Sequence, residues 1–117
     1  MQVLNFYKIG KTIPDSAVYI GRQNKQYGLE RSKFANPFPI TEYQDRDTVI
    51  KMYRSWLWNK IKLKEITVQE LLDLDSKDLV CYCSPHPCHG DVLVKAVEWA
   101  KTQPVTTKEF KDSYWNW

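Results

Sequence analysis

Three short apolar segments predict the strands of a sheet. Residues 2–9 and 17–20 mix Val, Leu, Ile and aromatic side chains, and each segment is followed directly by a glycine. Residues 78–83 carry no charge after Asp78. A continuous apolar run of this length is typical of a strand that is buried on both faces, so we expect this strand to lie in the centre of the sheet.

Three further segments repeat apolar residues at the spacing of a helix. Residues 45–62 begin with Asp45, which can cap the helix. The sequence Thr67-Val-Gln-Glu70 is a capping box that predicts a short helix ending near Leu74. A last helix is expected from Cys88 or His89 to about Thr102, with Pro104 ending it. Its apolar stripe consists of Val92, Leu93, Ala96, Val97 and Ala100.

The order of these elements predicts an α/β fold: strand, strand, loop, helix, helix, strand, loop, helix. We expect a single domain over residues 1–104, with a small Rossmann-like parallel or mixed sheet and helices packed on it, followed by an aromatic extension over residues 105–117. Ligands in such folds bind outside the carboxyl ends of the strands. The segments that leave these ends here begin at Gly21 and Cys83.

Composition excludes several classes of protein. The chain has 117 residues, of which 43% are apolar and 26% charged, which is typical of an ordinary globular domain. These values exclude collagen and disorder throughout. No apolar run approaches the roughly 18 residues that a membrane span needs, and the N-terminal residues do not resemble a signal peptide. We therefore expect a cytoplasmic protein with no membrane partner.

The net charge of +3 is unevenly distributed. Residues 1–35 contain six Lys or Arg and two acidic residues, whereas the rest of the chain is nearly neutral. This modest basic excess suits a ligand that bears phosphate. It is too small to predict duplex DNA binding, which typically takes about 6–10 phosphate contacts.

The sequence Cys81-Tyr-Cys83-Ser84-Pro-His-Pro-Cys88-His89-Gly90-Asp91 is the most distinctive chemical feature. Four interpretations stay open. Cys88 and His89 form a reactive or ligand-contacting pair at a helix start, where N–H groups and the dipole favour a thiolate or a phosphate. Alternatively, Cys81, Cys83, Cys88 and His89 bind zinc, although their spacing is unusual for that metal. In a third interpretation Cys81 and Cys83 are small buried core residues and His89 with Asp91 caps the helix, and in a fourth Cys83 and Cys88 form a redox switch through a disulfide. We expect no cofactor.

Three segments follow one another along the chain: Val18-Tyr-Ile-Gly-Arg22, Asn36-Pro-Phe38-Pro-Ile40 and the stretch from Leu79 to Leu93 that contains the cysteines. Together they resemble the domain of unknown function 4326, a family of bacteria and their phages. If a phage encodes the chain, we expect it in the host cytoplasm. The last segment is also similar to the domain of unknown function 488, which carries an Arg where this chain has Gly90. The resemblance implies an α/β sandwich of Rossmann-like character and no particular reaction.

These segments converge on one candidate site at the carboxyl ends of the strands. Arg22 offers a planar fork for phosphate or carboxylate, Asn36 can pair with a base or ribose edge, and Phe38 can stack on a base. Cys88 or Asp91 can serve as nucleophile or acid/base, together with His89. The predicted ligand-binding residues are Gly21, Arg22, Asn36, Phe38, Cys83, Ser84 and Gly90, and the candidate catalytic residues are Cys88, His89 and Asp91.

Two classes of function remain open from the sequence. The first is a protein that binds a nucleotide or another phosphorylated small ligand, with or without hydrolysis or group transfer, so enzymatic activity is undecided. The alternative is a non-catalytic interaction protein that binds a host protein or single-stranded nucleic acid, such as a phage anti-defence factor. Its anchors would be Trp56, Trp58, Trp115 and Trp117.

The last thirteen residues carry four large aromatic side chains. The segment Glu109–Tyr114 can form a short helix that places Phe110 and Tyr114 on one side. This tail can fold back over its own domain, dock on a second copy to make a homodimer, or stay exposed for another partner.

Overall fold

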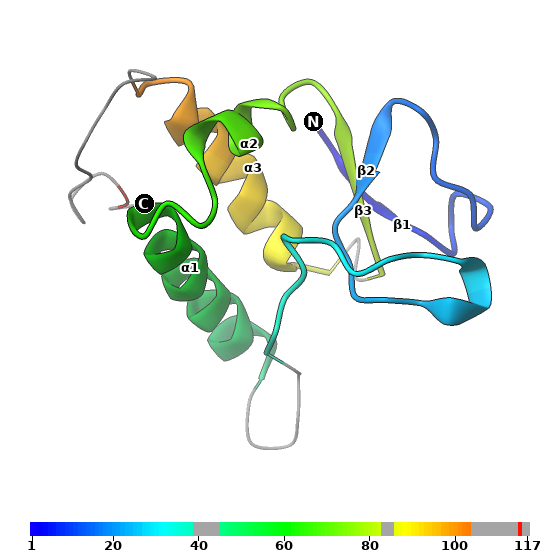
Figure 1. The fold of residues 1–117 in the computed structure, drawn as a ribbon. Helices are drawn as coiled ribbons and strands as arrows, with labels where there is room; N and C mark the ends of the chain where they lie inside the picture. The colour runs from blue at the N-terminus through cyan, green and yellow to red at the C-terminus, as the bar shows by residue number, and fades with distance from the viewer. Residues whose placement is uncertain (39–44, 83–85, 104–114, 116–117) are drawn as a thin grey trace.

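Helices and a sheet divide the structure into two halves, with every α-helix on one side of the sheet (Figure 1). The computed structural model describes residues 1–38, 45–82, 86–103 and 115. Along the chain, two strands precede a short 3-10 helix and two α-helices, and a third strand is followed by the last α-helix. The predicted α/β class and order of elements are therefore confirmed.

The sheet is parallel throughout and has the strand order β1-β3-β2. Its strands are β1 (Val3–Asn5), β2 (Ala17–Tyr19) and β3 (Asp78–Cys81), and Leu79 of β3 pairs with both neighbours. The prediction that the third strand is central and buried is confirmed, because Leu79 and Val80 are both 0% exposed.

The first strand is shorter than the sequence pattern predicts. The prediction ran to Ile9, but the backbone turns after Asn5, and the Lys8 N–H donates to the Asn5 carbonyl at 3.0 Å. The Asn5 side chain holds the turn, since its Oδ1 accepts from the Tyr7 N–H at 2.9 Å. The apolar residues that follow therefore belong to a turn and not to the sheet.

The helices begin where their capping residues predict. Helix α1 (Arg46–Lys62) begins after Asp45, whose carboxylate accepts from the Thr48 N–H at 2.8 Å. Helix α2 (Val68–Leu72) begins with the predicted capping box of Thr67 and Glu70. Helix α3 (His89–Ala100) has Cys88 as its N-cap.

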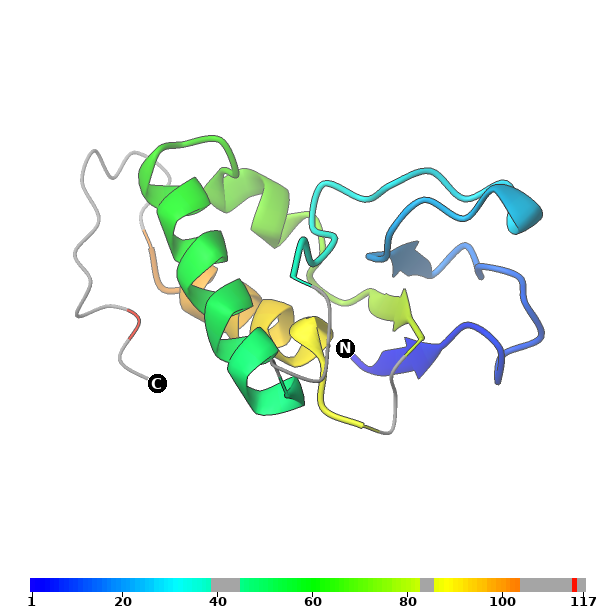
Figure 2. The same ribbon diagram turned by 90° about the horizontal axis from the view of Figure 1, so that it is seen from below.

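The main hydrophobic core lies between the three helices and one face of the sheet (Figure 2). The helix α3 contributes its whole predicted stripe, from Val92 to Ala100. On the opposite face of β3, Val80 and Phe6 are buried outside this cluster, and Phe6 packs against Tyr27 and Tyr82. The predicted packing of the last helix on the central strand is confirmed.

Three tryptophans pack against one another and form the tryptophan cluster: Trp58 of α1, Trp99 of α3 and Trp115. Trp115 is 3% exposed and stacks on Trp58 at a centroid distance of 5.0 Å. Its carbonyl accepts a hydrogen bond from Arg54 at 2.7 Å. At this residue the tail covers its own domain, so neither Trp58 nor Trp115 is an exposed anchor. The predicted helix at residues 109–114 and Trp117 lie outside the described residues, and the homodimer stays a prediction.

A membrane span was not expected from the sequence. Over residues 1–38, 45–82 and 86–103, none of the helices is long and apolar enough to cross a bilayer.

Candidate functional site

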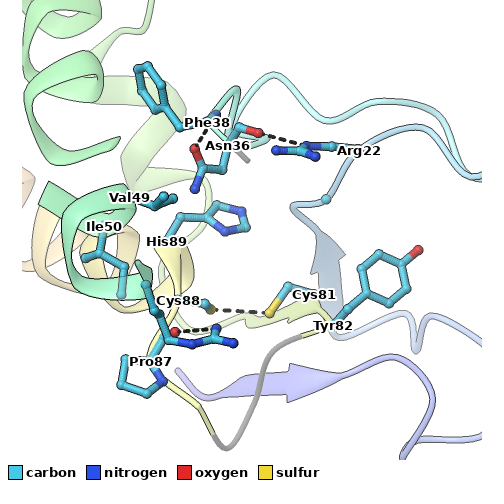
Figure 3. A pocket seen from close by; sticks show the side chains of 12 residues that line it. Arg22, Asn36, Phe38, Val49, Ile50, Cys81, Tyr82, Pro87, Cys88 and His89 are labelled. Atoms are coloured by element: carbon cyan, nitrogen blue, oxygen red, sulfur yellow. Dashed lines mark hydrogen bonds between the residues drawn. The ribbon is translucent and has the colours of Figure 1, made fainter. Parts of the chain in front are cut away.

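A cavity of about 330 Å³ opens at the carboxyl edge of the sheet, where the loops after β2 and β3 meet the first turns of α1 and α3 (Figure 3). The sequence argument placed a ligand at this edge because parallel strands direct their carboxyl ends to one side. Twelve side chains and backbone segments form its wall: Gly21, Arg22, Asn36, Phe38, Arg46, Val49, Ile50, Cys81, Tyr82, Pro87, Cys88 and His89.

The structure brings most of the predicted site residues together. Six of them line the cavity: Gly21, Arg22, Asn36, Phe38, Cys88 and His89. Gly90 and Asp91 lie beside it without lining it, and Cys83 and Ser84 fall outside the described residues.

Two arginines from different elements line the cavity. The Arg22 Nε donates to the Asn36 carbonyl at 3.0 Å, which fixes the guanidinium across the loop (Figure 3). The Arg46 Nη1 donates to the Pro87 carbonyl at 3.0 Å. Each guanidinium donates one N–H to a backbone carbonyl and has no other hydrogen-bond partner among the described residues. The remaining donors suit an anion.

The loop that carries Asn36 is braced by its own side chain. Asn36 Oδ1 accepts from the Phe38 N–H at 2.9 Å, an Asx-type turn that orients the Phe38 ring. Since the oxygen is used in this way, the Nδ2 group remains as a donor, and it is directed toward the cavity in Figure 3. Asn36 is therefore placed to donate to a ligand rather than to accept from it.

His89 is buried at the start of α3, at 8% exposure. Its Nε2 lies 2.8 Å from the Ile20 carbonyl, and because a carbonyl only accepts, Nε2 carries the proton. The ring also meets Tyr53 edge-on at 5.0 Å, and the Tyr53 hydroxyl donates to the Phe34 carbonyl at 2.7 Å. Burial raises the pKa of Tyr53 well above its usual value, so this hydroxyl stays neutral.

The Tyr19 and Tyr82 hydroxyls position the backbone at the cavity mouth. They lie 2.9 Å apart, and the Tyr19 hydroxyl also donates to the Arg22 carbonyl, while Asn24 donates to the Tyr82 hydroxyl. Burial and then the hydrogen bond with Tyr82 raise the pKa of Tyr19 far above its usual value. This network fixes Arg22 at the end of β2. Gly21 is required there because a Cβ would stand 2.5 Å from the Tyr19 hydroxyl.

Two sulfur atoms form part of the cavity wall. Cys81 ends β3 and Cys88 caps α3, and their Sγ atoms are 3.3 Å apart (Figure 3). The Cys88 Sγ also accepts from the Gly90 N–H at 3.3 Å. Both cysteines are reduced and buried.

Gly90 and Asp91 make their contacts within the fold, against the sheet and within the helix cap, and do not line the cavity. A Cβ on Gly90 would stand 3.0 Å from Val3 Cγ1, so the glycine lets α3 approach the sheet closely. The Asp91 carboxylate accepts from the Cys88 N–H at 3.0 Å and completes a capping box with Cys88. The capping role was one of the alternatives that the sequence left open.

Sequence reasoning missed Arg46 and the apolar wall of the cavity. Arg46 is the first residue of a helix, a position that predicts only an exposed side chain. Val49 and Ile50 fit the apolar stripe of α1, and nothing in their spacing separates a cavity wall from a core. Pro87 lies within the cysteine segment but carries no side-chain chemistry that would mark it.

The zinc interpretation depends in part on Cys83, which lies outside the described residues, and it stays open. Across residues 1–38, 45–82 and 86–103, His, Cys, Asp and Glu side chains form no group of three or more that could hold a metal ion. The sulfur atoms of Cys81 and Cys88 lie side by side, and because the Nε2 of His89 is bonded to the Ile20 carbonyl, Nδ1 is the nitrogen of that ring which could bind a metal. Cys83, the remaining candidate ligand, lies outside the described residues.

Comparison with known proteins places the chain in a family. A family model described as "Domain of unknown function (DUF4326)" matches residues 5–99. The chain belongs to this family. The match confirms the resemblance drawn from the cysteine segment, and it extends further toward the N-terminus than that resemblance did, to Asn5 at the end of β1. The DUF4326 match covers every residue that lines the cavity.

Two relatives of this DUF4326 protein come from viruses. One is an uncharacterized 12.4 kDa protein in the nrdA-td intergenic region of Enterobacteria phage T4, 30% identical over 59% of this chain. The other is an uncharacterized protein of Acanthamoeba polyphaga mimivirus, 32% identical over 67% of this chain. The chain spans 64% of the length of each. No solved structure gives a significant match.

Proposed function

We propose that this protein binds a nucleotide or another phosphorylated small ligand in the cavity. The observation that carries the proposal is the charge of the wall: Arg22 and Arg46 line it, and none of its described lining residues is acidic. Two guanidinium groups on a wall whose described lining contains no carboxylate favour a multiply charged anion, and phosphate matches their planar donor geometry.

The rest of the wall suits an aromatic or sugar ring. Phe38, Val49, Ile50 and Pro87 give the cavity an apolar side, and the Asn36 amide offers a donor. A volume of about 330 Å³ is within the range of small-molecule sites, roughly 300–1,000 Å³. A nucleotide combines an anionic phosphate, which the arginines could bind, with a flat base, which could lie against the apolar side of the cavity.

The start of α3 contributes less to anion binding than its position suggests. The Cys88 N–H is bonded to Asp91, the Gly90 N–H to the Cys88 sulfur, and the Asp91 N–H to the Cys88 carbonyl. Because the cap already uses these N–H groups, the two arginines supply the phosphate contacts in this proposal.

A thermal-shift screen with matched ligands tests the proposal. Nucleoside 5′-monophosphates should raise the melting temperature, whereas the same nucleosides without phosphate should not. At a ligand concentration ten times Kd the stabilisation is about 1.4 kcal/mol. Mass spectrometry of the same mixtures shows whether the ligand is also converted.

Variants assign any shift to the cavity. Arg22→Gln should abolish the shift, whereas Arg31→Gln, an exposed arginine that does not line the cavity, should retain it. Equal shifts in both variants, or no shift with any phosphorylated compound, would overturn the proposal.

A further inference from the structure

The contact between Cys81 and Cys88 is unusual in its placement as well as its distance. Their Sγ atoms are 3.3 Å apart, and both residues line the cavity although only 2% and 4% of their surfaces are exposed. Each sulfur belongs to a different element, the end of β3 and the N-cap of α3. A small solute that enters the cavity therefore reaches two thiols that are already in contact.

Cys88 differs from Cys81 in that its sulfur accepts a backbone hydrogen bond at a helix start, and we therefore assign it as the sulfur that attacks an oxidant. Its sulfur accepts the Gly90 N–H at 3.3 Å at the start of a 12-residue helix. Backbone N–H groups at a helix start stabilise a negatively charged sulfur. Arg46, whose guanidinium is held on the neighbouring Pro87 carbonyl, adds positive charge to the same wall.

We propose that Cys81 and Cys88 form a redox-active dithiol that takes hydrogen peroxide as its oxidant and closes to a reversible disulfide. The Cys88 thiolate attacks one peroxide oxygen, the O–O bond breaks, and the products are a sulfenic acid and hydroxide, which takes up a proton to become water. The Cys81 sulfur then attacks the sulfenic sulfur, an S–S bond forms, and a second water leaves with the Cys81 proton. The two thiols lose two electrons and the peroxide gains them.

This disulfide changes the wall of the cavity directly. It ties the end of β3 to the start of α3 and closes the short segment between them, which contains the lining residues Tyr82 and Pro87. It also converts the sulfur that caps α3 from a thiol into half of a disulfide. The inference does not depend on which ligand the cavity binds, because the reaction is read from the protein alone.

The sequence left a Cys83–Cys88 disulfide open, whereas the structure places Cys81 against Cys88. The Cys83→Ser variant separates the two pairings. The full chain, reduced and then freed of reductant, is treated with hydrogen peroxide and analysed by intact mass, thiol titration and peptide mapping. Wild type and Cys83→Ser should each lose about 2 Da, and the mapped cross-link should join residues 81 and 88 in both.

Further readouts keep the test independent of any folding defect. The oxidised wild type should melt at a higher temperature than the reduced form, and dithiothreitol should reverse both the mass change and the shift. Cys88→Ala and Cys81→Ala should lose the cross-link, with circular dichroism confirming that each variant is folded. A cross-link through Cys83, irreversible oxygen addition only, or reaction only after unfolding in urea would overturn the proposal.

Discussion

Substitution of Val97 by aspartate tests how the last helix is packed. Val97 is 0% exposed on the face of α3 that meets α1, α2 and β3. Among the described residues no Lys or Arg is buried, and the buried His89 is already bonded to the Ile20 carbonyl. An introduced carboxylate would therefore have no partner in this core.

The loss of stability in Val97→Asp can be estimated for the neutral acid, the form of the side chain that is least unfavourable to bury. Protonating a carboxyl of ordinary pKa at pH 7 costs about 4 kcal/mol, at about 1.4 kcal/mol per pH unit. Burying the neutral group without a hydrogen bond costs about 1–3 kcal/mol more, and the lost valine burial a further ~1.5–3 kcal/mol. The total approaches the stability of a typical domain, about 5–15 kcal/mol, so the variant should be largely unfolded at pH 7.

The effect has a characteristic pH dependence. Burial raises the pKa of the introduced carboxyl in the folded state above its unfolded value of about 3.9. Stability relative to wild type is therefore best below that value and falls by about 1.4 kcal/mol per pH unit as pH rises toward the folded-state pKa. Urea unfolding of Val97→Asp and of the uncharged Val97→Asn, each measured against wild type at pH 4.5 and pH 7.5, separates this effect from lost packing.

The uncharged variant should be destabilised by the same amount at both pH values, whereas the aspartate variant should worsen strongly at pH 7.5. Glu98→Asp, which places an aspartate at an exposed position of the same helix, should change stability by less than about 0.5 kcal/mol. A Val97→Asp protein that unfolds at the wild-type urea concentration at pH 7.5 would refute the assigned packing.

The remaining predictions concern a cap, the tail and a metal. Thr67→Ala removes the capping box of α2 and should lower the free energy of unfolding by about 1 kcal/mol in urea, with the exposed Gln69→Ala as the control that changes little. Trp115→Ala should destabilise the domain by about 3 kcal/mol at every protein concentration; a loss of dimer with unchanged unfolding would contradict this. Elemental analysis of untagged protein purified without chelator should find well below one zinc per chain, and a full equivalent that is lost in Cys83→Ser would establish a metal site.

The fold could be predicted to the extent that local signals and tertiary packing agree. Asp45 and Thr67 each cap a helix where the sequence indicated one, because capping is set by a few neighbouring residues. For the last helix the sequence suggested a cap by His89 with Asp91, whereas the structure has Asp91 paired with Cys88 as the N-cap. The central place of β3 followed from its apolar run. The end of β1 could not be predicted, since the apolar residues after Asn5 pack in a turn that the Asn5 side chain stabilises.

The candidate site was only partly predictable, because some of its residues meet through long-range contacts that leave no local signal in the sequence. Arg22 and Asn36 stood out as polar residues in a long loop next to a strand end, and they do line the cavity. Arg46 did not stand out, because its place in the cavity depends on how α1 meets the cysteine segment, a long-range contact with no local signal. Asp91 stood out for its chemistry, but its carboxylate is bonded within the helix cap.

The central claim is that paired arginines hold the phosphate of a small ligand, and calorimetric titration tests it most directly. Adenosine, guanosine, cytidine and uridine 5′-monophosphates are titrated in turn into wild type, Arg46→Gln and Arg31→Gln at low salt. The account predicts one site per chain for at least one nucleotide, with wild-type affinity in Arg31→Gln. In Arg46→Gln it predicts affinity weakened by roughly 10-fold or more, since a charge-assisted hydrogen bond contributes about 1.5–3 kcal/mol. Equal affinity in Arg46→Gln and wild type, or no binding of any nucleotide by wild type at millimolar concentration, would contradict it.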